Sequence, residues 1–370
     1  MANNNTIFGD NNTIDTGSTF NHVVGVNNYV GPDVSGVTVF GNSISATTGD
    51  TIYTNNIILY GTINGVPVSS ITSGFTGTTN YWSGDTNGNI IANNGSGNDA
   101  EGINSLAEGN QTLATGTGSH AEGYSSIAQG DGTHAEGEST QALASAAHAE
   151  GALSIASGAY SHAEGFQTLS NGFNSHTEGQ QTTASGSTAH AEGYNTQAGG
   201  QFSHTEGNYT TAIGDNSHVG GNYTIGNRLG EWARSSNGGI GQYGIIDLMG
   251  QTTDATPTEI FIGDVPNVRF TLENNSAYSI KISGIIRDTT SGDAATVASL
   301  NDLVVKNVSG TITIAYSPLL VHHGDASLTT ASIAITPSAD TPNQTIDFTV
   351  TGLLLTNIDW YLRLDYAKVI

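Results

Sequence analysis

Histidine and glutamate recur two residues apart through the middle of the chain, as in the tetrad HAEG at residues 162–165. Such a pair can ligate a metal, act as a general base with its partner, or form a repeated hydrogen-bonded row. The histidines recur with a constant spacing of 14 and no insertion, and a glutamate follows all but the last. The repeated set is His120, Glu122, His134, Glu136, His148, Glu150, His162, Glu164, His176, Glu178, His190, Glu192, His204, Glu206 and His218.

Catalysis is disfavoured by both the spacing and the number of these pairs. His-x-Glu differs from the His-Glu-x-x-His motif, which needs a helix to bring two histidines to one metal. An active site is one asymmetric group of residues, whereas these sets are nearly identical along the chain. We therefore expect that the protein is not an enzyme, has no catalytic residue and needs no cofactor.

A bound ion is the alternative to a purely structural role. Stacked or threefold-related histidines could bind a transition metal, and NGSGND at residues 94–99 resembles one calcium-binding turn. The charge pattern favours structure, because neighbouring carboxylates about 5 Å apart repel by roughly 1–3 kcal/mol. No lysine or arginine precedes Arg228, so histidine N–H groups are the abundant compensators. We expect rows that are buried or half-buried near a trimer axis or a seam between chains, with each glutamate accepting hydrogen bonds from histidine or backbone N–H groups and with no metal.

Composition excludes several classes of protein. Of 370 residues, 49 are glycine and none is cysteine, which excludes disulfides and thiolate metal sites. The net charge is −24, and all eight basic residues lie at or after Arg228. Nucleic acid and anionic membranes bind through basic groups, so we expect neither as a partner and no membrane insertion. The first residues, MANNN, lack the pattern of a secretion signal.

The 14-residue period predicts the architecture that holds the histidines. Each unit has a second half such as QTLATG or SSIAQG, with alanine and glycine at fixed positions. Fourteen residues fit two short strands and two tight turns, and like residues then stack about 4.8 Å apart. This predicts a parallel β-solenoid over residues 99–229. Its inward positions are small, so we expect lateral association of chains, as a homotrimer.

The flanking segments follow other patterns. TIFG, HVVG and TVFG place Gly9, Gly25 and Gly41 at equal intervals, which predicts solenoid-like repeats over residues 1–61 that attach the chain to a larger particle. Residues 62–98 lack a period and are expected to form a linker or collar. Regular short strands over residues 230–370 predict an antiparallel β-sandwich at the tip. The predicted fold class is thus all-β, a trimeric parallel solenoid followed by a sandwich.

The segment SHAEGYSSIAQGDGTHAEG resembles the head repeat of trimeric autotransporter adhesins, a left-handed parallel β-roll with coils of about 14 residues. Its histidine-containing version is similar to solenoids of bacteriophage tail-fibre and appendage proteins. The segment beginning GEWARSSNGGIGQYG resembles a β-rich domain that often follows such repeats in phage fibres. The resemblance implies a trimeric phage fibre or appendage protein.

These observations predict a structural fibre protein of a bacteriophage virion, on the tail or the head, made in the host cytoplasm. We expect the N-terminal region to bind other virion structural proteins and the tip to bind a glycan or protein of the host surface. Candidate receptor contacts are Trp232, Tyr243 and Tyr278. The alternatives are a bacterial trimeric surface adhesin and a depolymerase that digests host polysaccharide with paired carboxylates.

Overall fold

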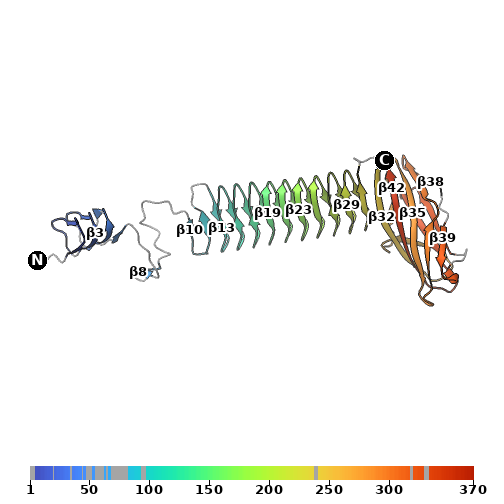
Figure 1. The fold of residues 1–370 in the computed structure, drawn as a ribbon, viewed down its shortest axis with the longest axis horizontal. Helices are drawn as coiled ribbons and strands as arrows, with labels where there is room; N and C mark the ends of the chain where they lie inside the picture. The colour runs from blue at the N-terminus through green and yellow to red at the C-terminus, as the bar shows by residue number, and fades with distance from the viewer. Residues whose placement is uncertain are drawn as a thin grey trace. The chain divides into compact units, whose positions relative to one another are not determined.

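The chain divides into two compact units, residues 1–78 and 79–370, which are described separately (Figure 1). A computed structural model describes residues 5–19, 21–33, 36–43, 45–46, 52–54, 62–63, 66–67, 82–92, 97–236, 241–316, 320–328 and 333–370. Most of the predicted collar, including residues 68–81, lies outside these ranges. No helix among the described residues is long and apolar enough to cross a membrane.

The first unit contains a short parallel solenoid. One sheet has the order β1 (Thr6–Phe8), β3 (His22–Val26), β5 (Thr38–Asn42) and β7 (Ile52–Thr54), and a second has β2 (Thr13–Ile14), β4 (Tyr29–Val30) and β6 (Ser45–Ala46). The register is constant from coil to coil, with Thr6 opposite His22 and His22 opposite Thr38. Four fully buried valines, Val23, Val30, Val37 and Val39, fill the interior. A two-stranded pair, β8 (Thr62–Ile63) and β9 (Val66–Pro67), follows.

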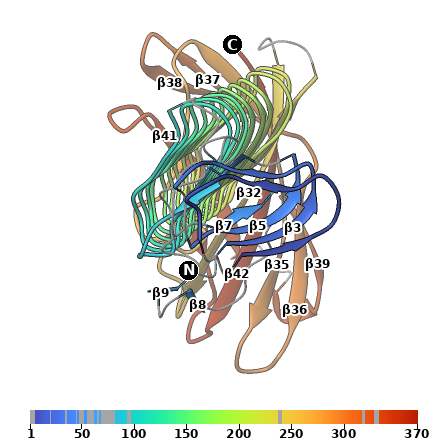
Figure 2. The same ribbon diagram turned by 90° about the vertical axis from the view of Figure 1, so that its left-hand side faces the viewer.

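The second unit begins with β10 (Trp82–Gly84) and β11 (Ile90–Ala92), which lead into a longer parallel solenoid. One face consists of β13 (Leu106–Ala107), β15 (His120–Ala121), β17 (His134–Ala135), β19 (His148–Ala152), β21 (His162–Phe166), β23 (His176–Gln180), β25 (His190–Tyr194), β27 (His204–Thr205), β29 (His218–Gly221) and β31 (Trp232–Ser235). Figure 2 shows these coils stacked one behind another.

The opposite face of this solenoid consists of shorter strands. They are β12 (Asp99–Ala100), β14 (Leu113–Ala114), β16 (Ile127–Ala128), β18 (Gln141–Ala142), β20 (Ile155–Ala156), β22 (Leu169–Ser170), β24 (Thr183–Ala184), β26 (Gln197–Ala198), β28 (Thr211–Ala212) and β30 (Ile225–Gly226). Each strand pairs in parallel with the corresponding strand of the next coil, as Leu113 with Ile127. The 14-residue solenoid that the sequence predicts is confirmed.

Small side chains fill the coils because the two faces lie close together. Alanines such as Ala121 and Ala128 are fully buried, and Ser126 and Thr140 fill the turns between strands, joined by a 3.0 Å hydrogen bond. Each coil therefore buries little apolar surface, and the backbone ladder supplies much of its regular bonding.

Two of the positions of the repeat that have positive φ differ, since only one of the two requires glycine. Gly137 has φ +111°, and an added Cβ would lie 2.0 Å from the carbonyl oxygen of Gly151 in the next coil. Gly132 has φ +64°, and an added Cβ would have no heavy atom within 4 Å. We call the second position the outer corner; it also accepts large residues, and it comprises Gly118, Gly132, Ala146, Tyr160, Asn174, Thr188, Phe202, Asn216 and Gly230.

The chain then continues into an antiparallel region. Its strands are β32 (Gly241–Thr252), β33 (Thr258–Ile262), β34 (Phe270–Thr271), β35 (Ser276–Asp288), β36 (Ala294–Ser299), β37 (Leu303–Val308), β38 (Thr311–Tyr316), β39 (Leu320–Gly324), β40 (Ala334–Asp340), β41 (Thr345–Thr351) and β42 (Ile358–Val369), with a short 3-10 helix at Ala326–Leu328. Strand β42 lies between β32 and β35, while β41 pairs with β33, β34 and β40. Inward side chains of both ladders share one apolar core.

A buried polar cluster joins the last solenoid coil to this region. Arg228 is 3% exposed, and its Nη1 lies 2.7 Å from Glu231 Oε1. The guanidinium donates to the carbonyl oxygen of Thr271 and lies 4.3 Å from the ring centre of Phe270. Tyr366 donates to Glu231 from the final strand. Strand β31 also pairs directly with β32, so hydrogen bonds continue from the solenoid into the antiparallel region.

Candidate functional site

The histidine row follows from the register of the parallel strands. Pairing with the same register in every coil places each histidine beside the next, as His148 beside His162, and each glutamate beside the next, as Glu150 beside Glu164. From His120 to His204 the ring centres are 4.6 to 4.9 Å apart and the planes differ by 2 to 5°. His218 is rotated by 73° from His204, and Trp232 follows it at 5.2 Å.

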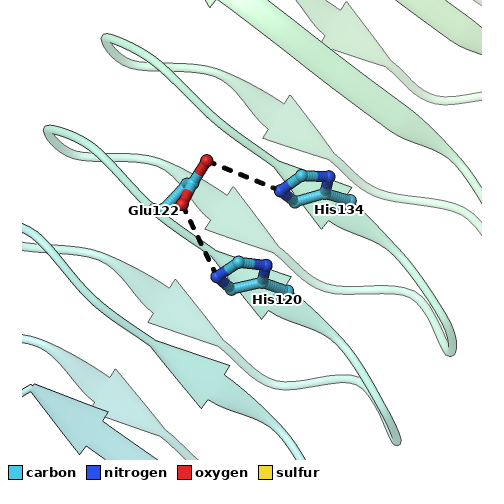
Figure 3. A group of neighbouring side chains, drawn as sticks. All are labelled: His120, Glu122 and His134. Carbon is cyan, nitrogen blue, oxygen red and sulfur yellow. Dashed lines mark ion pairs between the residues drawn. The ribbon is translucent and has the colours of Figure 1, made fainter.

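Glu122 and Glu150 each lie between two histidines rather than beside their own alone. Figure 3 shows Glu122 with one oxygen 3.8 Å from Nε2 of His120 and the other 3.9 Å from Nε2 of His134. The side chains are about one third exposed, at 30% for His120 and 34% for Glu122. Both rows are therefore half-buried on one outward face, since the intervening alanines point inward.

Hydrogen bonds between the two rows are few. His120 Nε2 lies 3.2 Å from Glu108 Oε1, within hydrogen-bonding distance. By contrast, six Nε2 atoms are covered but have no hydrogen-bond partner among the described residues, those of His134, His148, His162, His176, His190 and His204. Within one chain, therefore, few histidines are hydrogen-bonded to glutamate, and the expectation that each glutamate accepts hydrogen bonds where chains meet stays a prediction.

Neighbouring glutamates instead shift one another's pKa values. A hydrogen bond to Glu136, with burial, raises the pKa of Glu122 to about 7, and the pKa of Glu150 is raised to about 7 in the same way. Those hydrogen bonds, accepted from both neighbours, lower the pKa of Glu136. A hydrogen bond to Glu178 likewise raises the pKa of Glu192. A shared proton halves the charge of each pair, which compensates the row without lysine or arginine.

Three histidines of the row have lowered pKa values for a related reason. Burial lowers the pKa of His134, His162 and His190, and the neighbouring histidines above and below lower it further. A stack of charged imidazoles this close together would repel strongly, so the stacked geometry favours the uncharged rings.

Four groups combine two histidines and a glutamate with ligand atoms within 4.8 Å of one another: His120, Glu122 and His134; His148, Glu150 and His162; His162, Glu164 and His176; and His176, Glu178 and His190. Imidazole and carboxylate suit zinc and related metals. Parallel rings direct their Nε2 lone pairs the same way, however, so two neighbours would have to tilt out of the stack to share one ion. The observed geometry fits stacking better than coordination, and the turn predicted for calcium lies partly outside the described residues.

An open groove of about 570 Å³ runs along the glutamate row. Glu108, Glu122 and Glu136 line it, together with the glycines that follow them. The groove exists because those glycines have no side chain beside the row. It brings several carboxyl groups to one accessible surface, where they can accept hydrogen bonds or donate a proton.

The three aromatic residues predicted to contact a receptor differ in position. Trp232 is 57% exposed at the end of the histidine stack, and Tyr243 is 47% exposed with its hydroxyl 3.0 Å from Asp365. Tyr278 is 1% exposed, so its assignment as a surface contact is wrong. It occupies an inward position of β35 and packs edge-on to Phe270 at 5.6 Å in the core.

Other exposed aromatics were missed by reasoning from the sequence. Tyr160 and Phe202 lie at the outer corner and are 60% and 59% exposed. Tyr209 and Tyr223 lie at another turn, with parallel rings 4.7 Å apart. Their fixed phase in the 14-residue unit was the signal that could have identified them, because Tyr160 and Phe202 recur at one phase of the repeat and Tyr209 and Tyr223 at another.

Comparisons with known proteins give a limited result. The YadA head domain repeat matches residues 121–143, 198–217 and 206–225, within the 14-residue repeat. No curated protein matches the chain.

Two solved structures are similar only at low scores. The tailspike protein gp49 from Acinetobacter baumannii bacteriophage Fri1, a capsular polysaccharide depolymerase, is 10% identical with a TM-score of 0.20, and the match covers 98% of this chain and 56% of that one. The tailspike protein of Acinetobacter phage vB_ApiP_P1 is 9% identical with a TM-score of 0.20, covering 94% and 70%. The chain thus spans little more than half of the first tailspike, and neither likeness carries an argument.

Proposed function

We propose that the chain is a structural fibre protein of a bacteriophage virion, on the tail or the head, whose C-terminal region binds the host cell surface. The observation that carries this proposal is the buried junction between the solenoid and the antiparallel region. Strand β31 pairs with β32, and Arg228 and Glu231 form an ion pair inside the joint. A hydrogen-bonded joint of this kind transmits orientation, which a protein needs when it presents a binding domain at the end of a shaft.

The repeat supports the same role. The match to the YadA head domain repeat, and the resemblance to adhesin heads and phage appendages, associate such coils with surfaces exposed to other cells. The described solenoid before Arg228 carries carboxylates but no lysine or arginine, which keeps a projecting shaft soluble and self-repelling. A bacterial trimeric surface adhesin has the same requirements and is the first alternative.

We further propose that the functional unit is a homotrimer attached through its N-terminal region. The interior of each coil holds alanine, serine and threonine, so one chain buries little apolar area. Association of chains would bury further apolar surface and would couple folding to assembly. Light scattering at micromolar concentration tests this, and a stable folded monomer contradicts it.

Location is the decisive test of the proposed function. Gold-labelled antibodies against residues 241–370 should decorate projecting fibres on purified virions, and the purified chain should compete with virions for adsorption to bacteria. Label confined to the envelope of uninfected cells would favour the bacterial adhesin. If a saturating concentration of the purified chain leaves virion adsorption unchanged, the proposed binding to the host surface is wrong.

A polysaccharide depolymerase is the second candidate, because a specific observation favours it. The groove along the glutamate row contains carboxyl groups whose pKa values are shifted in opposite directions, as Glu122 upward and Glu136 downward. Glycosidases use such a pair as acid and nucleophile or base. Release of reducing sugar from capsule that is abolished by Glu122→Gln but retained by Glu138→Gln would support it, since Glu138 follows Glu136 in the chain but does not line the groove.

A further inference from the structure

A groove of about 540 Å³ lies on the antiparallel region, away from the histidine and glutamate rows. It crosses the outward face of three neighbouring strands, β32, β42 and β35. The register places Tyr361 between Met249 and Ile285, and Asp359 between Gln251 and Arg287. Two adjacent cross-strand rows therefore form the floor, one apolar and one polar.

The groove is held by the packing beneath it. Trp360 points inward from β42 and donates its Nε1 to the hydroxyl of Thr252 at 2.9 Å. This fixes the strand so that its neighbours Asp359 and Tyr361 point outward. At the rim, the loop after β33 is tied to the sheet, because Gly263 N–H donates to the carbonyl oxygen of Asp247 at 3.1 Å. Asp264 then lines the groove from this loop.

The side chains that line the groove form an apolar surface flanked by hydrogen-bond donors and acceptors. Tyr361 is 37% exposed and Ile285 is 48% exposed. Gln251 donates to Asp359 at 2.7 Å, which orients that carboxylate. The guanidinium of Arg287 is exposed and has no hydrogen bond or ion pair with another described residue. An unpaired planar donor beside an oriented acceptor is suited to bind an external polar group.

We propose that this groove binds a glycan of the host surface, through neutral hexose or N-acetylhexosamine units. The apolar face of a sugar ring packs on Tyr361 and Ile285, while adjacent hydroxyls accept from Arg287 and donate to Asp359 and Asp264. One positive and two negative side chains line the groove, and the whole chain carries −24, so an acidic polymer is disfavoured. The inference rests on the proposed function and adds the ligand class and its residues.

The test uses the full chain, labelled and applied to an array of bacterial oligosaccharides that contain neutral hexoses, N-acetylhexosamines or uronic acids. Binding of the same protein to a panel of whole bacteria is measured in parallel. The variants are Tyr361→Ala and Arg287→Gln. The control is Lys281→Gln, which removes a positive charge from the same face of the same strand outside the groove. Circular dichroism and light scattering verify that each variant keeps its fold and assembly.

We expect wild-type protein to bind neutral or N-acetylated sugars, each groove variant to weaken this binding by about tenfold or more, and the control to leave it unchanged. If both groove variants bind the sugars as strongly as the wild-type protein does, the inference is overturned. Binding to bacteria with no sugar bound on the array also overturns it, while the fibre function stands. Altered assembly of Tyr361→Ala with unchanged sugar binding identifies the face as a contact between copies and overturns the inference too. Failure of the fibre function itself is recognised separately, by the absence of antibody label from virions.

Discussion

Replacing Gly137 by alanine tests how closely the coils approach one another. An added Cβ would lie 2.0 Å from the carbonyl oxygen of Gly151, whereas ordinary contact begins at 3.4 Å. The two coils must therefore move apart at this point, since the atom in the way belongs to the backbone and has no rotamer to change. That carbonyl accepts the N–H of Glu138 at 2.9 Å, and the separation breaks this bond.

The cost follows from two contributions. An orphaned backbone group costs about 1–3 kcal/mol, and the backbone conformation at φ +111° costs alanine a further 1–3 kcal/mol or so. We expect Gly137→Ala to destabilise the chain by about 2–6 kcal/mol.

Gly132→Ala is the matched control, because it introduces the same methyl group five residues earlier without a clash. Left-handed backbone costs alanine about 1–2 kcal/mol, and the stiffer unfolded chain returns about 0.4–1 kcal/mol. The expected loss is about 0–1.6 kcal/mol. Urea denaturation followed by circular dichroism compares the two variants at equal protein concentration. Equal shifts of the two midpoints would refute the close approach of the coils.

Three further outcomes concern the titrating and buried charges. Thermal stability should not rise between pH 6.5 and 9: the raised pKa of Glu150, about 7, gives stability that is complete below 4.5 and lost as the pH rises to 7, while the lowered pKa of His162 gives stability that is already complete above 6.5 and is lost as the pH falls. Melting temperatures that increase steadily from pH 5 to 9 would contradict this. Glu231→Gln should cost the antiparallel region about 3–5 kcal/mol by leaving Arg228 buried without a full counter-charge, as measured by calorimetry, and Arg228→Met with Glu231→Leu should cost less. Glu164→Ala should destabilise the chain by about 1 kcal/mol, and its melting temperature should fall more than that of the double change His162→Val with Glu164→Ile, which replaces both polar side chains by apolar ones; equal melting temperatures would count against a coupled row.

The sequence predicted the solenoid because its period is strict. A constant register is enough to place His148 beside His162 and to bury the alanines between them, whatever the detailed turns. The change of pattern after residue 229 likewise identified the antiparallel region. These features depend on the spacing and alternation of residues along the chain, which the sequence shows directly.

The details of the site depended on which neighbours come closest. Parallel register brings like residues together, so Glu136 raises the pKa of Glu122 through a hydrogen bond, although a histidine precedes each of them in the sequence. Tyr278 was placed on the surface because the sequence does not show which face of β35 covers the core. Arg287 and Asp359 lie far apart in the chain, and only the pairing of β35 with β42 brings them together.

The buried position of Arg228 has a practical consequence for proteolysis. No lysine or arginine precedes it, so trypsin has no site on its N-terminal side. While the joint is intact, the side chain is 3% exposed and shielded from the protease, and Arg234 is the first accessible site. Opening of the antiparallel region uncovers Arg228 and shortens the N-terminal fragment, which then ends at Arg228 instead of Arg234. The length of the largest tryptic fragment thus reports whether the antiparallel region is still packed against the last coil of the solenoid.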